Sequence, residues 1–554
     1  MDKHLELANL VFPDVKETIA DLEKKYPKRN LPQGAMVTRF APSPTGFLHT
    51  GSLFASAVSQ KVAKQTQGVF YIRLEDTDQK REVAGSGKLL VEQMKRFGVV
   101  PDEGYMGDEE VGNYGPYVQS KRADIYKVVI KEMLKKDLAY LCFCSANELS
   151  EMRKAQQAKK ENFGYYGKYA KCSFMSVEEQ IAKVKSGKEY VIRFRSHGDY
   201  HNKVSLDDAI RGHIEIAQND QHVVIYKSDG LPTYHFAHLV DDHFMRTTHV
   251  TRGEEWLPSV PIHLELFSAM DWQAPTYCHL PVIMKLDNGV RRKLSKRKDS
   301  EAAVSYFLEK GYPVDGFMEY LYTISNSNYE AWRNANRNAS RDEFNFDFSK
   351  MSLDGALFDL DKVKNLCKEY LGNLSCQDMY NSTYAYAKEF DSELKALFDR
   401  DNDYMKEILS IEREKDNPRK DYEKYSDIKD LILFFFSDYY DKMVKDLQLP
   451  ENISKEVIIK VLQEYSKIVD LEKTEDEWFM DMKNLALSMN FAKNNKLVKK
   501  NPGVYNGSVA DFANIIRLAE TLRSSSPNLY IVLKIIQKTE VVRRLENLAN
   551  SLLN

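Results

Sequence analysis

The stretch RFAPSPTGFLHTGSLF, Arg39 to Phe54, decides the fold of the first half of the chain. Residues 36–40 form a short, mostly apolar segment that predicts a strand, and the two prolines predict a loop over residues 41–47. Residues 48–65 predict a helix, and the β-rich residues 69–75 predict a second strand. The helix is indicated by apolar residues that recur every four positions: Phe54, Val58 and Val62.

A helix that joins two buried strands is the unit of a parallel sheet, whose ligands bind at the carboxyl ends of the strands. The loop 41–46 and the EDTD segment 75–78 both fall at such ends. The helix begins with the quartet HTGS, residues 49–52. Unpaired N–H groups at a helix N-terminus attract phosphate, and a glycine lets a ligand approach the backbone. The quartet therefore predicts a phosphate site, with a histidine that only caps the helix as the alternative.

Length and composition set the class of protein. With 554 residues the chain exceeds one hydrophobic core and predicts several domains. No apolar run is long enough for a membrane helix, and the N-terminus resembles neither a secretory signal nor a transit peptide, so we expect a cytoplasmic protein. Six cysteines agree with a reducing compartment. A net charge of −3 means that any nucleic acid must be held by local basic patches.

The pattern of predicted helices and strands changes along the chain. From about residue 126 to 230, a charged helical stretch and a Gly/Tyr-rich loop precede short strand-like pieces, which predicts an inserted domain. Strand and helix patterns resume at residues 231–285, so the insertion splits the parallel sheet. After Arg297 the strand signals fade and the remainder reads as helices.

A basic segment follows a later apolar strand. RRKLSKRKDS, residues 291–300, has six Lys and Arg within eight positions and a serine inside. A solvated basic loop is one interpretation of such a run. Together with the HTGS quartet, the segment resembles the signature pair of class I aminoacyl-tRNA synthetases. RFAPSPTGFLHTG, RLEDTD, TRGEEWLPS and KLSKR resemble the glutamyl-tRNA synthetases of bacterial type. The likeness covers roughly residues 37–546, weakly over 376–475, and leaves the first 36 residues outside.

The resemblance implies a glutamate pocket with two cationic clamps and one anion. It implies that Arg39 and Tyr234 hold the side-chain carboxylate, since the planar guanidinium binds carboxylates bidentately. Arg252 is then expected at the α-carboxylate. Ser43 and Glu75 are expected at the ammonium group.

The resemblance also implies the reaction. The glutamate α-carboxylate attacks the α-phosphorus of ATP to give glutamyl-adenylate and pyrophosphate, and the glutamyl group then passes to the 3′ end of tRNA(Glu). Such chemistry depends on positioning and charge stabilisation rather than on a protein nucleophile. Mg²⁺ is expected to bridge the phosphates. The residues implied as catalytic are His49, Ser52, Lys293 and Lys296, and Gly51, Glu255 and Ser295 are added as ATP contacts.

The sequence departs from the family pattern at three positions. Ser52 occupies a place where the wider superfamily often has histidine, although glutamyl enzymes carry small residues there. His238 stands where the family often has asparagine, next to the glutamate. In AETLR, Leu522 replaces a glycine that commonly precedes the arginine, so Arg523 is predicted as a tRNA contact with weaker support.

Three cysteines resemble the zinc site of some bacterial glutamyl enzymes. They are Cys142, Cys144 and Cys172. A closed structural zinc needs four ligands, and only these three are obvious. Tyr165, Tyr166 and Tyr169 are the candidates for the fourth ligand. Whether zinc binds is left open by the sequence.

We therefore predict an α/β class: a class I Rossmann-type catalytic domain split by an insertion, then a connecting domain and an all-α anticodon-binding domain. The predicted boundaries are 1–36 (extension), 37–125 and 231–285 (catalytic halves), 126–230 (inserted acceptor-end domain), 286–372 (connecting domain with the KLSKR loop) and 373–554 (anticodon domain). The predicted function is a glutamate–tRNA ligase, with tRNA(Glu), L-glutamate and ATP as partners, no membrane, and a monomeric state. A glutaminyl enzyme, a glutamyl enzyme that also charges tRNA(Gln), and an inactive tRNA-binding paralogue are the alternatives.

Overall fold

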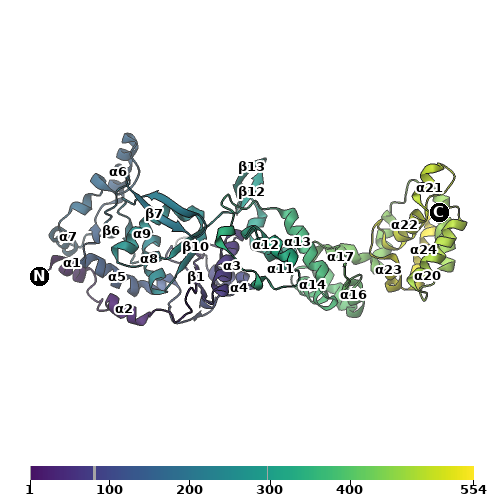
Figure 1. The fold of residues 1–554 in the computed structure, drawn as a ribbon, viewed down its shortest axis with the longest axis horizontal. Coiled ribbons are helices and arrows are strands. Elements are labelled where there is room, and N and C mark those ends of the chain that lie inside the picture. Colours follow the sequence, from purple (N-terminus) through teal and green to yellow (C-terminus); the bar gives the residue numbers. More distant parts are fainter. Residues whose placement is uncertain (1, 79–82, 296, 554) are drawn as a thin grey trace. The chain divides into compact units, whose positions relative to one another are not determined.

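The computed structural model describes residues 2–78, 83–295 and 297–553, and the chain divides into two compact units. The first comprises Met1–Tyr306 and Met318–Asp359, and the second comprises Phe307–Phe317 and Leu360–Asn554 (Figure 1). The finer division into six segments stays a prediction. Within the described ranges no helix has the length and apolar character to cross a membrane.

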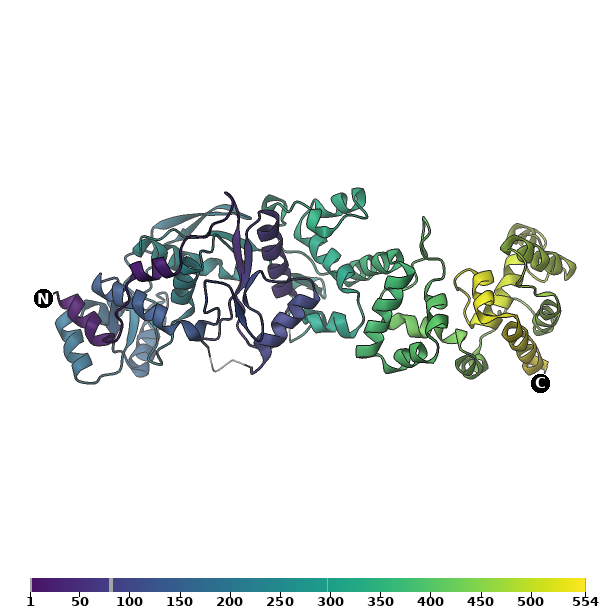
Figure 2. The same ribbon diagram turned by 90° about the horizontal axis from the view of Figure 1, so that it is seen from below.

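The first unit is built around the predicted strand–helix–strand. Strand β1 (Val37–Phe40) and strand β2 (Val69–Ile72) pair in parallel, in register from Val37 with Val69 to Phe40 with Ile72. Helix α3 (Thr50–Gln65) crosses between them (Figure 2). It is buried along most of its length. β2 continues in parallel to β3 (Glu103–Tyr105), and β4 (Glu110–Val111) closes this edge antiparallel.

A second βαβ unit lies on the other side of β1. Strand β10 (His249–Gly253), helix α9 (Val260–Ala269) and strand β11 (Thr276–Leu280) form it, with the two strands in parallel register. The N–H of Thr248, just before β10, donates to the carbonyl oxygen of Val37 at 3.0 Å. The carboxyl ends of β1, β2, β10 and β11 therefore meet along one edge, where ligands of parallel sheets bind.

The segment between the two halves carries its own small sheet. β5 (Ala139–Cys142), β6 (Val191–Phe194) and β9 (Val224–Tyr226) are antiparallel. The hairpin β7–β8 (Lys203–Asp208 and Gly212–Ala217) is separate and approaches β11, where the N–H of Ala209 donates to the Tyr277 carbonyl oxygen at 2.9 Å. Helices α6 (Ala146–Lys159) and α7 (Val177–Lys185) lie within this segment. Helices α4 (Ser86–Arg96) and α5 (Ala123–Lys135) precede β5, and α8 (Tyr234–Phe244) follows β9.

The first 36 residues are part of this core. Helices α1 (Lys3–Val11) and α2 (Ile19–Lys25) place Leu7, Phe12 and Leu22 in one cluster with residues of α5, β5, α8 and α9. Hydrogen bonds also connect the N-terminal segment to helix α5. The Lys131 ammonium donates to the carbonyl oxygens of Phe12 and Val15 at 3.0 and 2.7 Å.

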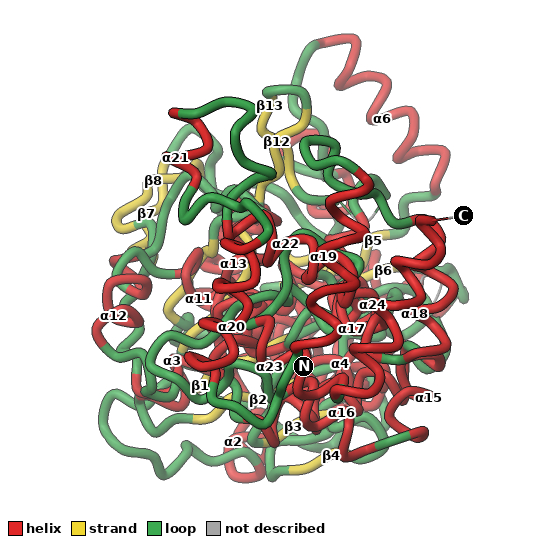
Figure 3. The backbone as a smooth tube through the Cα atoms, turned by 90° about the vertical axis from the view of Figure 1, so that its right-hand side faces the viewer, coloured by secondary structure: helices red, strands yellow, loops and turns green. Residues whose placement is uncertain are grey.

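The basic segment forms the end of a hairpin. β12 (Met284–Asp287) and β13 (Val290–Lys293) are antiparallel, and they appear as a yellow pair in the view coloured by secondary structure (Figure 3). Strand β13 ends at Lys293, so Leu294 and Ser295 lie outside the strand. After it come α10 (Val304–Glu309), α11 (Val314–Ser325) and α12 (Tyr329–Ala335).

The second unit consists, in its described residues, of helices around one large core. They are α13 (Leu360–Asn373), α14 (Cys376–Phe390), α15 (Ser392–Arg400), α16 (Asn402–Leu409), α17 (Ser426–Ile432), α18 (Ser437–Met443), α19 (Lys455–Ile468), α20 (Glu475–Ser488), α21 (Asn495–Lys500), α22 (Val509–Thr521), α23 (Leu529–Ile536) and α24 (Lys538–Leu553). The helical reading of the C-terminal half is confirmed.

Candidate active site

A cavity of about 1030 Å³ opens at the carboxyl ends of the parallel strands. It is lined by the loop after β1, the first turn of α3, the ends of β10 and β11, and the end of the β12–β13 hairpin. Most residues predicted from the sequence lie in its wall: Arg39, Ser43, His49, Gly51, Ser52, Glu75, Tyr234, Arg252, Glu255 and Lys293. The cavity thus brings the HTGS quartet and the first lysine of KLSKR to one site.

Among the described residues predicted for the catalytic, glutamate, ATP and tRNA sites, three do not line this cavity: His238, Ser295 and Arg523. His238 is fully buried, donates or accepts at Tyr277 Oη (2.9 Å), and lies behind the ring of Tyr234. Burial lowers the pKa of His238 to about 4 despite the neighbouring Asp242 carboxylate, so this imidazole is neutral. Because His238 does not line the cavity, it does not contact a ligand there directly. Ser295 is half-buried beside the cavity, and Lys296 lies outside the described residues.

Arg523 belongs to the other compact unit. It directly follows Leu522, the cap of α22, whose φ of 59° is left-handed. Glycine adopts this conformation without cost, so the backbone at position 522 also suits a glycine. One guanidinium nitrogen of Arg523 donates to the Asp430 carbonyl oxygen at 3.0 Å. The proposed role of Arg523 toward tRNA stays a prediction.

His49 forms the N-cap of α3. Its Nδ1 accepts the N–H of Gly51 at 2.9 Å, so that the other ring nitrogen, Nε2, carries the proton in the neutral form. The next residue, Thr50, is fully buried and donates its hydroxyl to the carbonyl oxygen of Glu301 at 2.7 Å. The segment that follows the basic loop therefore packs directly on the first turn of α3. His49 therefore caps the helix and also lines the cavity, and its role toward phosphate stays a prediction.

The basic loop is anchored by acidic partners. The Asp299 carboxylate accepts two bonds from the Arg292 guanidinium, at 2.7 and 2.8 Å, and one from the N–H of Ser295 at 2.9 Å. These bonds hold the pKa of Asp299 below its usual range, with the Arg292 bond as the largest cause. Lys293 pairs with Glu255 across the mouth of the cavity at 2.7 Å. The Lys293 ammonium is half-exposed and so is available to an anion that enters.

A buried cluster of charged side chains lies behind the part of the cavity wall that Arg39 and Glu75 form. Arg73 is fully buried and contacts Asp242 at 2.6 Å and Glu75 at 3.0 Å, and Asp242 also pairs with Arg39 at 3.3 Å. Burial raises the pKa of Asp242, but the Arg39 and Arg73 charges outweigh it and hold that pKa well below its usual range. Two residues that face the cavity, Arg39 and Glu75, are therefore fixed through one buried arginine.

Gln119 is a cavity residue that the sequence did not indicate. Its amide donates to Asp241 at 2.9 Å, and Asp241 is held in turn by Arg122 at 2.6 Å. Asp241 lies more than a hundred positions from both partners, so no local pattern links them. Trp256, whose ring is 4.5 Å from that of Tyr234, also lines the cavity. Trp256 lies inside the TRGEEWLPS motif, so its place in that motif could have identified it as a site residue.

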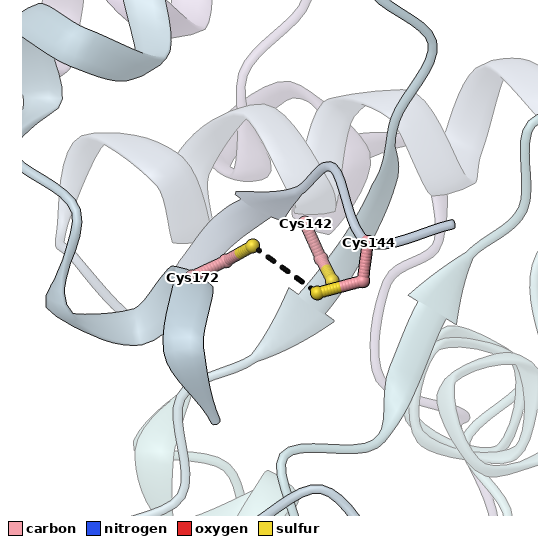
Figure 4. Close-up of side chains that lie close together, drawn as sticks. All are labelled: Cys142, Cys144 and Cys172. Carbon is pink, nitrogen blue, oxygen red and sulfur yellow. Dashed lines mark hydrogen bonds between the residues drawn. The ribbon is translucent and has the colours of Figure 1, made fainter. Parts of the chain in front are cut away.

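The three predicted metal-ligand cysteines meet in the inserted segment (Figure 4). The sulfur atoms of Cys142, Cys144 and Cys172 all lie within 4.8 Å of one another. Of the three candidate tyrosines, Tyr165 points its hydroxyl at the cluster, 3.2 Å from the Cys144 sulfur. Tyr166 and Tyr169 instead donate to Asn162 and Glu161. Three thiols around one buried oxygen form a donor set that fits zinc.

Comparison with protein families shows the class of protein to which the chain belongs. Residues 35–363 match the family model of the tRNA synthetases class I (E and Q), catalytic domain. This match covers more than half of the chain and includes the cavity described above. The chain therefore belongs to the class I tRNA synthetases of the E and Q family.

Full-length relatives narrow the assignment. The chain is 44% identical over 541 residues to a glutamate–tRNA ligase of Clostridium perfringens (strain 13 / Type A), covering 97% of this chain and 99% of that protein. It is 43% identical to the glutamate–tRNA ligase of Clostridium beijerinckii, covering 98% and 99%. A crystal structure of a glutamate tRNA ligase from Elizabethkingia meningosepticum, in complex with its amino acid, matches with a TM-score of 0.71 at 28% identity, covering 94% and 100%. The predicted family, fold class and enzyme class are confirmed.

One expectation about the resemblance was wrong. The first 36 residues were placed outside it, yet the C. beijerinckii match leaves only 2% of the chain, about eleven residues, uncovered. The extension is therefore largely shared with such relatives. Its place in the core, through Leu7, Phe12 and Leu22, gives the physical reason.

Proposed function

We propose that the chain activates L-glutamate with ATP and transfers it to tRNA(Glu), with the cavity at the carboxyl ends of the parallel strands as the active site. The observation behind this proposal is the set of charged side chains that line the cavity. Two buried arginines, Arg39 and Arg252, face the same space as the carboxylate of Glu75. Two cations and one anion complement the two carboxylates and the ammonium group of glutamate.

The glutamate end of the cavity lies over the charge cluster. Arg39 with Tyr234 binds the side-chain carboxylate, Arg252 binds the α-carboxylate, and Glu75 with Ser43 binds the ammonium group. Burial raises the pKa of Glu75 against the pull of Arg73, and a bound ammonium group favours its charged form. Arginine serves here because its planar fork accepts a carboxylate at two points.

The nucleotide end lies between α3 and the hairpin. The positive end of the α3 dipole and the proton on His49 Nε2 bind the phosphates, with Gly51 allowing close approach and Ser52 beside it. Lys293 leaves Glu255 to neutralise the departing pyrophosphate, and Ser295 and Lys296 assist from the same loop. Mg²⁺ that accompanies ATP supplies further charge neutralisation on the phosphates.

A charging assay tests this function against its nearest rivals. Purified protein is expected to attach labelled glutamate, not glutamine, to tRNA(Glu) when ATP is present. Activity with glutamine alone indicates a glutaminyl enzyme, and glutamate on both tRNA(Glu) and tRNA(Gln) indicates a glutamyl enzyme of dual specificity. Binding of tRNA without either product contradicts the proposal and indicates an inactive paralogue. The protein is proposed to act as a monomer in the cytoplasm.

We also propose that the three cysteines hold one structural zinc, with Tyr165 as the fourth donor. The support is the approach of three sulfur atoms and one hydroxyl within a buried cluster. The zinc would cross-link β5 to the loop that carries Cys172. Elemental analysis is expected to find about one zinc per chain, lost in Cys144→Ala and retained in Cys278→Ala, a buried cysteine of β11. Untreated protein without zinc contradicts this proposal.

A further inference from the structure

Arg252 differs from the other arginine of the glutamate pocket in its electrostatic surroundings. It lies on β10 with 6% of its surface exposed, and within the described ranges no carboxylate pairs with it at ion-pair distance. Arg39, in contrast, pairs with Asp242 at 3.3 Å. A buried charge without a counterion is costly, so the Arg252 guanidinium favours binding of a ligand carboxylate.

Neutral acceptors hold the guanidinium in place. Arg252 Nε donates to His279 Nε2 at 3.0 Å, and one of its terminal nitrogens approaches His263 Nδ1 at 3.3 Å. Arginine has donors only, so each of these ring nitrogens must be unprotonated. The remaining contacts, to Tyr234 Oη at 3.4 Å and the Trp256 carbonyl oxygen at 3.5 Å, are also uncharged.

The tautomer of His279 is set from the inserted segment. Because Nε2 accepts from Arg252, the proton of His279 resides on Nδ1, which donates to Asp208 at 2.7 Å. Asp208 ends strand β7 and is itself fixed by the N–H groups of Ile210 and Arg211, both at 3.0 Å. Asp208 and His279 are almost completely buried, and neither lines the cavity.

We propose that Asp208 and His279 are positioning residues for the substrate α-carboxylate. They form a chain from the β7–β8 hairpin that orients Arg252 through a neutral acceptor, and no carboxylate of the described residues pairs with its charge. The inference rests on the proposed function, because it names the group that Arg252 binds. The chain holds the guanidinium by hydrogen bonds to neutral groups, so its full charge is available to the amino acid.

The test separates glutamate binding from chemistry. His279→Leu removes the acceptor, and we expect the KM for glutamate in ATP–pyrophosphate exchange, measured with tRNA present, to rise about 10- to 100-fold, as for a lost hydrogen bond to a charged group. The kcat and the KM for ATP are expected to stay within about twofold, because neither depends on the orientation of Arg252. His279→Gln keeps an acceptor oxygen and is expected to recover most of the loss.

A neighbouring residue supplies the matched control. Cys278→Ala removes a fully buried side chain from the same strand, β11, without touching Arg252. It is expected to leave the KM for glutamate unchanged. An equal rise in Cys278→Ala and His279→Leu overturns the proposal, because any disturbance of β11 then has the same effect.

A substrate analogue identifies the group that is bound. In 4-amino-5-hydroxypentanoate the α-carboxylate of glutamate is replaced by a hydroxymethyl group. Its inhibition constant is expected to be the same for wild type and His279→Leu, because the group aimed by the chain is missing. A loss of affinity as large as that for glutamate overturns the proposal.

The outcomes also distinguish this inference from the proposed function. A wild-type protein without glutamate-dependent exchange contradicts the function itself. An active wild type with an unchanged KM in His279→Leu contradicts only the positioning chain. If His279→Leu does not fold, Asp208→Asn is the test. Without the Asp208 carboxylate, the imidazole proton of His279 can move to Nε2, which then no longer accepts from Arg252. The KM for glutamate of Asp208→Asn is therefore expected to exceed that of His279→Gln, and equal KM values reject the positioning chain.

Discussion

At the scale of single residues, the side-chain clamp of the pocket is Arg39. Its counterion Asp242 is shared with Arg73, so Arg39→Ala leaves that carboxylate compensated and the protein folded. We expect the KM for glutamate to rise about 10- to 100-fold, the size of a lost charged hydrogen bond, with a smaller change in kcat. Steady-state charging over a range of glutamate concentrations measures it. An unchanged KM shows that Arg39 does not contact the amino acid.

A second residue-scale prediction concerns Glu520, which is fully buried in the second unit. Neither carboxylate oxygen has a hydrogen-bond partner among the described residues, and burial raises the pKa of Glu520 well above its usual value against the opposing Arg544 charge. In the unfolded chain the group ionises near its ordinary pKa, so the folded state loses stability as pH rises above about 4.5.

Glu520→Gln removes this ionisation. We expect the free energy of unfolding to increase by about 1–3 kcal/mol at pH 7–8, the scale for a poorly solvated polar group, and the gain to shrink toward pH 4. Urea unfolding at several pH values measures it. A gain that does not depend on pH contradicts the account, because it then arises from packing and not from charge.

At the scale of elements, the N-terminal helices act as part of the catalytic core. Leu22 of α2 is fully buried in the cluster that includes α5 and α8. Leu22→Ala is expected to lower the free energy of unfolding by about 2–5 kcal/mol, the usual cost of a cavity. Lys24→Ala, at an exposed position of the same helix, is the control and is expected to change it by less than about 0.5 kcal/mol. Equal effects of the two variants exclude this role of α2.

The same elements show what the sequence can predict. The unit β1–α3–β2 follows from local patterns, since apolar spacing, the prolines of the loop and Gly68 all act within 40 residues. The charge cluster does not: Arg73, next to the end of β2, meets Asp242 of α8 only because the fold brings these two distant segments together. The α1 and α2 helices are short, and their burial depends on partners more than a hundred positions away.

At the scale of the whole molecule, the net charge of −3 confines tRNA binding to local basic patches. Phosphate contacts release counterions, so we expect the KM for tRNA to rise by about tenfold or more between 50 and 200 mM KCl. The KM for glutamate is expected to change little, because Arg39 and Arg252 are buried and screened less. Parallel rises in both constants refute this separation. Charging assays at fixed pH supply both values.

The central claim is that the HTGS quartet and the basic hairpin form one ATP site. Rapid-quench measurement of adenylate formation, at saturating glutamate and ATP with tRNA present, tests it most directly. His49→Ala and Lys293→Ala are each expected to slow this step about 10²- to 10³-fold, because both groups act on the phosphate charge that develops in the transition state. Lys298→Ala, at an exposed lysine of the same loop, is the control and is expected to react at close to the wild-type rate. If His49→Ala and Lys293→Ala also form adenylate at near the wild-type rate, the two segments are not one catalytic site and the account is contradicted.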